Sequence, residues 1–356
     1  MKIRSFEAAS VDLPLREGYR IANQTITFAR NMLVRVESNE GLIGFGSAAP
    51  ANNEGGESDE SCLAALRGPL QALALGAEVP PDPSPLANEA LRLAADSPAA
   101  RAALDMALWD LVARKAEVPL VRLWGGEPRP LATSVTIGIC DLEETLAAAR
   151  AWIAQGFRIL KIKIGEDVAL DAERLRKMRE VLGPEVVLRV DANQGYSLED
   201  ARTLLRETDG LNLEMLEQPL SARDLDGLRA LRGESRVPII ADEAAGTIEE
   251  CEEIVDRGAA DGINIKLMKC GGPSAARAIH DRAHSAGLSL MLGCNDETRV
   301  SIAAAAHLAL AMPGLKYADL DGHMDLLRDP ARSGFEVRDG CLHVDERPGL
   351  GVEVAF

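Results

Sequence analysis

The sequence lacks any apolar run long enough to cross a membrane. A membrane-spanning helix needs roughly 20 apolar residues in succession, and no run here approaches that length. The chain also has no basic and then apolar leader at its start. The six cysteines are scattered without CxxC spacing, which is typical of free thiols in a reducing compartment. These absences predict a cytoplasmic protein that does not associate with a membrane.

Positive charge is scarce relative to negative charge. The chain holds 39 lysines and arginines against 56 aspartates and glutamates, which gives a formal net charge of −17. Nucleic acids and anionic membranes are polyanions, so electrostatic repulsion argues against both as partners. An acidic surface often serves solubility alone, although it also suits cationic or zwitterionic ligands. We therefore expect a small-molecule ligand and no nucleic acid.

The chain contains two regions of different texture. Residues 1–130 open with extended, alternating segments, pass through a polar glycine-rich loop at 50–59, and continue with helical stretches. Strands followed by helices are an α+β pattern. From about residue 132, short apolar runs alternate with amphipathic helical stretches that tend to end at glycine. The sequence therefore predicts two domains of different architecture.

The second region repeats a strand and a helix about once every 25 residues. Its eight apolar runs lie at 134–139, 159–164, 186–192, 211–217, 238–243, 262–267, 288–293 and 315–321. Eight parallel strands without a GxGxxG or P-loop motif favour a closed barrel over a flat doubly wound sheet. No clear eighth helix follows at 322–330, and the tail contains strand-like pieces. We predict an α/β fold, with a (β/α)7β modified TIM barrel at 131–322, an N-terminal α+β capping domain at 1–130, and a segment at 323–356 that returns to the cap.

Three acidic residues end consecutive strands of the predicted barrel. Asp191, Glu217 and Asp242 are 26 and 25 residues apart, which is one β/α unit each time. Functional groups of such barrels collect at the C-terminal ends of the strands, so the three carboxylates should converge. They would repel one another without a hard cation, and oxygen ligands suit Mg²⁺ or Mn²⁺. Helix capping is the alternative for any one acid, but three in register favour a metal site.

Two lysines share one face of the strand in RILKIKIG (158–165). Lys161 and Lys163 are two residues apart, so both point away from the apolar face, where their like charges repel. Lys266 lies on the sixth run, on the other flank of the three acids. A partly desolvated lysine near like charge has a lowered pKa, which suits it to proton abstraction. We expect Lys163 and Lys266 to address opposite faces of one substrate.

Five segments together carry a family resemblance. LKIKIG, VDANQGY, LEQPL, ADE and INIKLMKCGG occur in this order, and with them the sequence resembles the muconate-lactonizing-enzyme subgroup of the enolase superfamily over essentially its whole length. The resemblance implies removal of a proton α to a carboxylate, through an enediolate that a divalent metal stabilises. By position, it implies the three acids as Mg²⁺ ligands, Lys163 and Lys266 as the two acid/base residues, and Lys161 as an electrostatic helper.

The stretch YADLDGH (317–323) narrows the substrate. Asp319 and Asp321 resemble the DxD motif of the dipeptide epimerases, in which both aspartates hold the free α-ammonium of the substrate. Residues two apart on a strand share a face, so both carboxylates can contact one cation. Thr136, in the first run, matches a position that touches the dipeptide backbone in these enzymes. The resemblance implies a homo-oligomeric isomerase that epimerises the C-terminal residue of an L,L- or L,D-dipeptide.

Other interpretations stay open. An N-acylamino-acid racemase of the same subgroup would share the metal site and the lysines without needing both aspartates. An o-succinylbenzoate synthase or a muconate cycloisomerase acts on substrates that have no ammonium group. A non-catalytic peptide-binding protein on the same barrel would not need both lysines.

Three residues bear on the side-chain preference. In an ungapped alignment, Gln24 occupies the place where epimerases of Ala-Glu commonly carry an arginine. Asp296 stands before Glu297, where the family usually has an apolar residue, and Glu54 lies in the glycine-rich loop. We expect these three residues and Glu297 to lie near the substrate. Additional carboxylates near the mouth of the barrel favour a cationic or polar side chain on the substrate.

Overall fold

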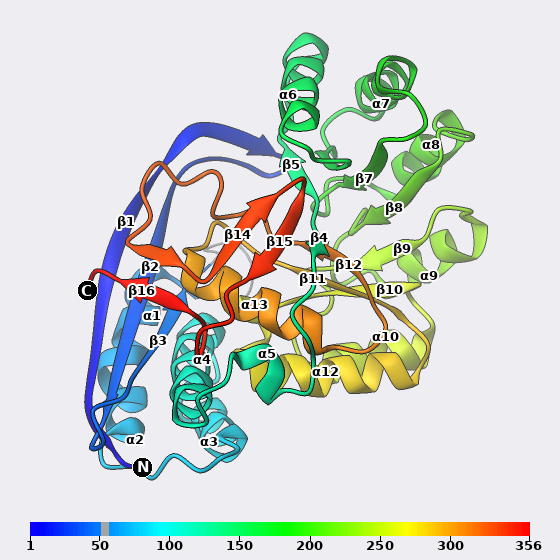
Figure 1. Cartoon of the computed structure of the whole chain (residues 1–356). Helices are drawn as coiled ribbons and strands as arrows, with labels where there is room; N and C mark the ends of the chain where they lie inside the picture. Colours follow the sequence, from blue (N-terminus) through cyan, green and yellow to red (C-terminus); the bar gives the residue numbers. More distant parts are fainter. Residues whose placement is uncertain (51–56) are drawn as a thin grey trace.

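The first three strands form an antiparallel sheet in the computed structural model, which describes residues 1–50 and 57–356 (Figure 1). These strands are β1 (Ile3–Ile21), β2 (Gln24–Ser38) and β3 (Ile43–Ala48), paired in the order β1-β2-β3. The pairing of β1 with β2 continues to Ile21↔Gln24, with an irregular register between Pro14 and Tyr19. The two strands therefore make one long hairpin, drawn in blue, whose tip reaches β5 of the barrel (Figure 1).

Helices cover one face of this sheet. They are α1 (Asp59–Ala65), the π-helical turn η1 (Leu66–Leu70), α2 (Gln71–Ala74), α3 (Ser84–Leu93), α4 (Pro98–Lys115) and α5 (Leu120–Leu123). The helical stretch from α1 to α2 is interrupted in η1, because Gly68 has non-helical dihedrals and Pro69 follows it. The sheet and α4 approach closely at Gly44 and Gly46. A Cβ on Gly44 would lie 2.2 Å from the carbonyl oxygen of Ala107, and one on Gly46 would lie 1.8 Å from that of Ala103. No larger residue would fit at either position without moving α4.

Eight parallel strands form the second sheet, in the order β12-β11-β10-β9-β8-β7-β6-β5. They are β5 (Val135–Ile137), β6 (Ile159–Lys163), β7 (Val187–Asp191), β8 (Leu213–Glu217), β9 (Ile239–Ala241), β10 (Gly262–Lys266), β11 (Ser289–Gly293) and β12 (Leu315–Asp319). Each falls within an apolar run expected from the sequence. The backbone N–H of Ser134 donates to the carbonyl oxygen of Ala318 at 3.1 Å, which joins the first strand to the last. The predicted barrel is confirmed.

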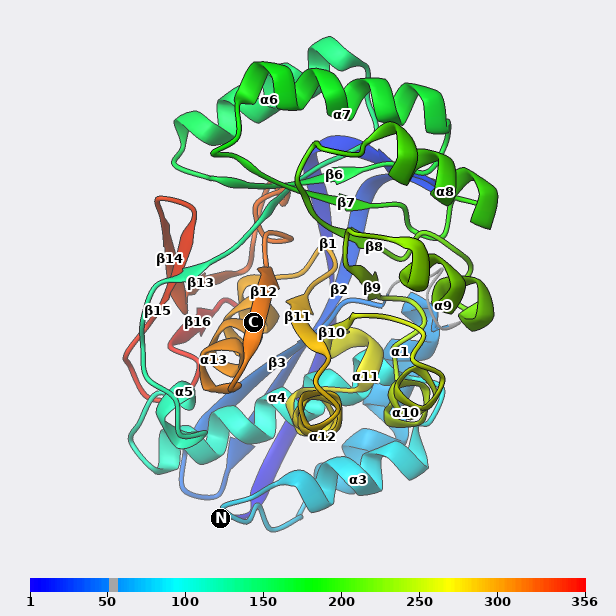
Figure 2. The same ribbon diagram turned by 90° about the vertical axis from the view of Figure 1, so that its right-hand side faces the viewer.

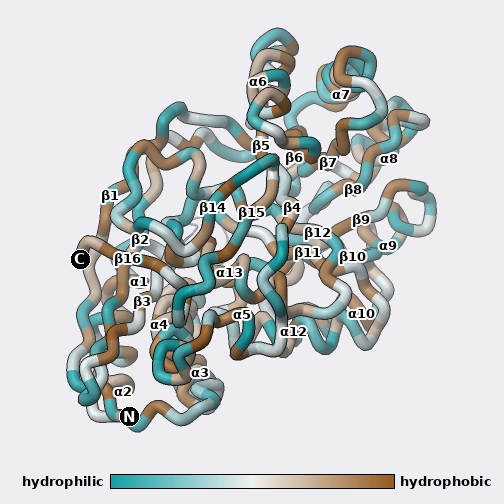
Figure 3. Tube along the Cα trace, viewed as in Figure 1, coloured by the Kyte–Doolittle hydropathy of each residue, from teal (hydrophilic) through white to brown (hydrophobic). Residues whose placement is uncertain are grey.

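Helices alternate with the strands around the barrel (Figure 2). They are α6 (Leu142–Ala154), α7 (Val168–Leu182), α8 (Leu198–Glu207), α9 (Leu225–Glu234), α10 (Ile248–Arg257), α12 (Pro273–Ser285) and α13 (Arg299–Ala311), with a one-turn helix α11 (Leu267–Cys270) after β10. Side chains such as Asp141, Ser197 and Thr247 accept backbone N–H groups at the helix starts, as N-caps do. Hydrophobic and hydrophilic segments alternate along α7 and α8 (Figure 3). This is the pattern of an amphipathic helix with one apolar face.

The chain after β12 returns to the cap. The described residues 320–330 contain no helix, and four short strands follow: β13 (Ala331–Ser333), β14 (Phe335–Arg338), β15 (Cys341–Val344) and β16 (Val352–Val354). β13 pairs with β16, β14 pairs with β15, and β15 pairs in turn with β4 (Leu131–Ala132). The backbone N–H of Leu350 donates to Asp110 on α4 at 2.8 Å. The domain boundaries 1–130, 131–322 and 323–356 stay predictions. None of the described helices combines the length and apolar character needed to span a bilayer.

The β1–β2 hairpin lies over the C-terminal ends of the barrel strands. The N–H of Ile139, just after β5, donates to the carbonyl oxygen of Arg20 at 2.7 Å, and the Arg20 guanidinium pairs with Glu166 at 3.0 Å. Next to it around the barrel, Leu15 forms a β-bridge with Leu326 in the loop after β12. The cap is therefore tied to the ends of neighbouring strands at the mouth of the barrel.

Candidate active site

Three buried carboxylates meet at the ends of β7, β8 and β9. Asp191 and Glu217 face each other in the strand register, and Asp242 follows β9 directly. All three side chains are fully buried, and one oxygen from each lies within 4.8 Å of the others. Three converging oxygen ligands fit a hard divalent cation such as Mg²⁺, whose remaining coordination positions water or substrate oxygens can fill.

Neighbouring amides hold the three acids in place. The side-chain nitrogen of Asn264 donates to Glu217 at 2.7 Å, and the backbone N–H of Asn193 donates to Asp191 at 2.9 Å. The side-chain oxygen of Gln218 accepts the backbone N–H of Asp242 at 2.8 Å. Sequence reasoning assigned no role to Asn193, Gln218 or Asn264, although all three lie in the quoted motifs or beside the acids.

The lysines control the charge of this cluster. Burial alone would raise the pKa of Asp191, but Lys161 and Lys163 hold that pKa at about 2. Burial raises the pKa of Glu217 to about 7, with the charge of Asp191 adding to the effect. Burial alone would raise the pKa of Asp242, but the nearby charges of Lys266 and Lys269 lower that pKa below its usual value. The cluster thus combines strong negative potential with several ammonium groups.

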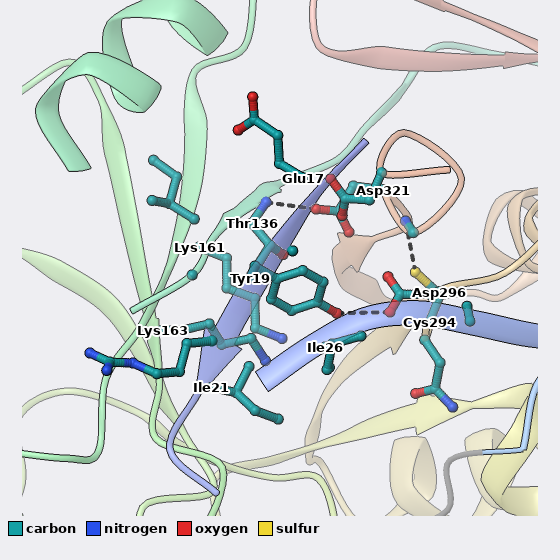
Figure 4. A pocket seen from close by; sticks show the side chains of 18 of the residues that line it. Glu17, Tyr19, Ile21, Ile26, Thr136, Lys161, Lys163, Cys294, Asp296 and Asp321 are labelled. Carbon is teal, nitrogen blue, oxygen red and sulfur yellow. Dashed lines mark hydrogen bonds between the residues drawn. The ribbon is translucent and has the colours of Figure 1, made fainter. Parts of the chain in front are cut away.

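The two lysines of β6 point to the same side of the strand, as expected from their spacing (Figure 4), and their Nζ atoms contact the acids. The Nζ atom of Lys161 lies 3.0 Å from Asp191, 2.9 Å from Glu217 and 2.8 Å from Asp319. The Nζ atom of Lys163 lies 2.7 Å from Asp191. Although burial opposes it, the surrounding carboxylates raise the pKa of Lys161 well above its usual value. Lys161 is therefore a permanent positive charge at the centre.

Two more lysines contact the acid on the far side. The Nζ atom of Lys266 lies 2.9 Å from Asp242, at the opposite end of the triad from Lys163. Lys269, on α11, also contacts the Asp242 carboxylate and reaches the carbonyl oxygen of Asn264 at 3.1 Å. Sequence reasoning missed Lys269, because it follows the strand end by one helical turn.

The aspartates of YADLDGH lie beside the lysines. Asp319 accepts the hydroxyl of Ser134 at 2.6 Å, and Asp321 accepts the backbone N–H of Thr136 at 2.6 Å (Figure 4). Burial and the charge of Asp319 raise the pKa of Asp321 to about 7. Despite its burial, Asp319 has a lowered pKa because Lys161 is adjacent. The backbone of Thr136 therefore orients one carboxylate, and Lys161 and Ser134 orient the other.

A cavity of about 820 Å³ joins these groups to the hairpin. Its lining includes both lysines of β6, Lys266, Thr136, Gln24, Asp296, Asp319, Asp321 and Asp325. The hydroxyl of Tyr19 donates to Asp296 at 3.0 Å, and burial raises the pKa of Asp296 to about 6 (Figure 4). Sequence reasoning missed Tyr19 and Asp325, the latter with a pKa that burial raises to about 8.

Two more residues expected near the substrate are Glu297 and Glu54. Glu297 is 1% exposed, accepts the backbone N–H of Asn295 at 2.8 Å and is not among the described residues that line the cavity. Burial raises its pKa to about 7. Glu54 lies outside the described residues.

Family models match both parts of the chain. Residues 4–125 match the mandelate racemase/muconate lactonizing enzyme N-terminal domain, and residues 144–355 match the enolase C-terminal domain-like family. The chain belongs to the enolase superfamily. The resemblance to its muconate-lactonizing-enzyme subgroup is thereby confirmed.

Relatives in this superfamily cover almost the whole chain. An L-Lys-D/L-Arg epimerase from Methylococcus capsulatus is 46% identical over 353 residues, which is 99% of each chain. The crystal structure of the dipeptide epimerase from that organism, complexed with Mg and the dipeptide L-Arg-D-Lys, matches with a TM-score of 0.95 at 44% identity, covering 99% of each chain. A substrate-liganded L-Ala-D/L-Glu epimerase from Bacillus subtilis matches with a TM-score of 0.96 at 34% identity, covering 100% of each chain.

Proposed function

We propose that this enolase-superfamily protein is a dipeptide epimerase that inverts the α-carbon of the C-terminal residue and prefers positively charged side chains. The observation that carries the proposal is the cavity in which Lys163 and Lys266 flank the acidic triad while Asp296 and the Asp319–Asp321 pair line the wall. The names of the relatives support the reaction class. The predicted homo-oligomer and cytoplasmic location stay predictions.

We assign the triad to Mg²⁺, with Mn²⁺ compatible with the same oxygen donors. Asp191, Glu217 and Asp242 would hold the ion, and the Mg-bound crystal structure of the Methylococcus relative supports the choice. When bound, the ion offsets the negative charge that develops on the substrate carboxylate as the α-proton leaves. The permanent charge of Lys161 adds to this stabilisation from within the protein.

We assign the proton transfers to Lys163 and Lys266. Each Nζ atom reaches a different end of the triad, so a substrate carboxylate bound between them presents one face of its α-carbon to each lysine. One neutral amine takes the α-proton, and the opposite ammonium returns a proton to the other face. The configuration at the α-carbon is thereby inverted.

We assign the substrate's free ammonium to Asp319 and Asp321. Both are nearly fully buried and are already oriented by Ser134 and Thr136. Lys161 already compensates the charge of Asp319, whereas burial and that charge raise the pKa of Asp321 to about 7. A cation beside Asp321 would favour its charged form, and charge-assisted hydrogen bonds then fix the dipeptide's N-terminus. This contact would place the α-carbon of the second residue between the two lysines.

We assign the C-terminal side chain to the region of Asp296. The charges of Lys163 and Lys266 both reach the Asp296 carboxylate, so it lies near the reacting carbon. Gln24, which also lines the cavity, stands where epimerases of Ala-Glu commonly carry an arginine. A carboxylate at position 296, with glutamine and not arginine at position 24, favours a lysine or arginine side chain over a glutamate side chain. The substrates named for the Methylococcus relative support this preference.

The test is a dipeptide library in D₂O with Mg²⁺, read as mass gain at the α-carbon. We expect exchange and epimerisation of free dipeptides, highest with Lys- and Arg-containing members. A clear preference for Ala-Glu would overturn the side-chain assignment alone. Equal turnover of N-acetylated and free dipeptides would favour an N-acylamino-acid racemase. Binding without exchange would favour a non-catalytic peptide-binding protein.

A further inference from the structure

Asn31 joins the capping sheet to the loop that carries Asp296. It lies on β2, and its side chain is fully buried at 0% exposure. Its amide nitrogen donates to the backbone carbonyl oxygen of Asp296 at 3.0 Å, and its amide oxygen accepts the backbone N–H of Thr298 at 3.0 Å. The Asn31 side chain therefore holds the loop backbone on both sides of Glu297.

Other contacts from the cap reach the same loop. Thr298 precedes α13, yet its hydroxyl donates to the Ser47 hydroxyl at 2.9 Å instead of capping its own helix. The side-chain nitrogen of Asn295 reaches the carbonyl oxygen of Ala49 at 3.3 Å. The loop after β11 is thus shaped by β2 and β3 as much as by the barrel strand from which it emerges.

The side chain of Asp296 depends on this backbone clamp. Its carboxylate accepts the Tyr19 hydroxyl, so the cap contacts Asp296 through both its backbone and its side chain. Both amide atoms of Asn31 are engaged by the loop, although the residue also lines the cavity. A small rotation of the loop would move the carboxylate away from the substrate side chain, and misplaced groups lose much of their effect.

We infer that Asn31 is a positioning residue for substrate selection, which fixes the loop so that the Asp296 carboxylate faces a cationic side chain. The inference rests on the proposed function. The cap thereby sets the position of the barrel loop that selects the substrate, and it does so through the buried side-chain amide of Asn31.

The measurement is the ratio of kcat/KM for an L-Lys-L-Arg dipeptide to that for L-Ala-L-Ala. In Asn31→Ala this ratio should fall about tenfold, as expected when a buried hydrogen-bonded contact is lost. The fall should appear mainly as a raised KM for the cationic dipeptide, with turnover of L-Ala-L-Ala changed by no more than about threefold. Gln71→Ala is the matched control, because the Gln71 amide ties the cap internally to the Phe6 carbonyl at 3.0 Å. The control should keep the ratio.

A double-mutant cycle distinguishes positioning from a general structural role. If Asn31 acts through Asp296, adding Asn31→Ala to Asp296→Asn should lower the ratio no further. Additive losses would overturn the inference. Asn31→Ser, whose hydroxyl is too short to reach both partners, replaces Asn31→Ala if the alanine variant does not fold.

The outcomes separate this inference from the proposed function. A normal ratio in Asn31→Ala, together with a lowered ratio in Asp296→Asn, would overturn the role of Asn31 alone. An unchanged ratio in Asp296→Asn would overturn the proposed side-chain preference and the inference with it. A uniform loss of turnover with both substrates in Asn31→Ala would also overturn the inference.

Discussion

The two halves of the cavity wall are built in different ways. The barrel half consists of strand ends one β/α unit apart, and it carries the triad and the lysines. The cap half consists of Tyr19, Gln24 and Asn31 on a hairpin, and Tyr19 and Asn31 hold Asp296 in the loop after β11. Under the proposed function, the comparison teaches that the chemical step depends on the barrel strand ends, whereas the choice of side chain depends on a barrel loop that the cap holds, so each should be alterable without the other.

The largest effect should come from the triad in the barrel half. Asp242→Asn should lower kcat/KM for every dipeptide by at least about a thousandfold, because it removes one of three converging carboxylates. EDTA should abolish wild-type turnover, and added Mg²⁺ should restore it. Asp226→Asn, at an exposed ion pair with Arg257, is the control and should keep full activity. Full activity of Asp242→Asn with an unchanged metal requirement would contradict the metal assignment.

The two lysines should give the next largest effect. Lys163→Ala and Lys266→Ala should each lower epimerisation by about 10²–10⁴-fold, as expected for loss of a general acid or base. Each variant should still exchange the α-proton of one epimer in D₂O, because the other lysine remains on its face. Lys177→Ala, at an exposed pair with Glu180, serves as the control. Equal exchange of both epimers by either variant would show that a single base suffices.

The ammonium contact should have a smaller effect that depends on the substrate. In Asp321→Asn the amide oxygen can still accept the Thr136 N–H, so the change removes charge and little else. Activity on free dipeptides should fall by at least about tenfold, whereas activity on N-acetylated dipeptides should change little. Kinetics with paired free and acetylated substrates provide the measurement. A parallel loss for both would argue that Asp321 has only a structural role.

The smallest effect should be a pH dependence of selectivity. Burial raises the pKa of Asp296 to about 6, so its carboxyl group is largely neutral at pH 5 and charged at pH 8. The preference for cationic over neutral dipeptides should therefore rise as the pH is raised through about 6. Using the ratio of the two substrates cancels the titration of the catalytic lysines. Asp296→Asn should flatten the profile, and a wild-type ratio that is constant with pH would contradict the assignment.

The sequence made the barrel half largely predictable, because its spacing repeats. Acids one β/α unit apart must meet at one edge of a parallel barrel, and Asp191 and Glu217 do face each other in register. Asn193 and Gln218 were quoted within motifs but received no role. Their function depends on which oxygen of a neighbouring acid they contact, and spacing along the chain does not encode that.

The cap half was not predictable in the same way. Tyr19 and Asn31 reach Asp296 across 277 and 265 positions of sequence, so no local pattern links them. Gln24 was found only through alignment with the family. Glu297 is expected near the substrate, and its near-complete burial depends on packing that the sequence alone does not reveal.

The pairing of β1 with the loop after β12 has a consequence for how the protein is made. The N–H of Arg16 donates to the carbonyl oxygen of Asp325 at 2.8 Å, so residues synthesised 309 positions apart must meet (325 − 16 = 309). The hairpin cannot complete this contact until the last part of the barrel has left the ribosome. Contacts of such long sequence separation form slowly. A nascent chain therefore acquires the strands that carry the acidic triad well before it acquires an enclosed cavity, and under the proposed function only a nearly finished chain can select a substrate.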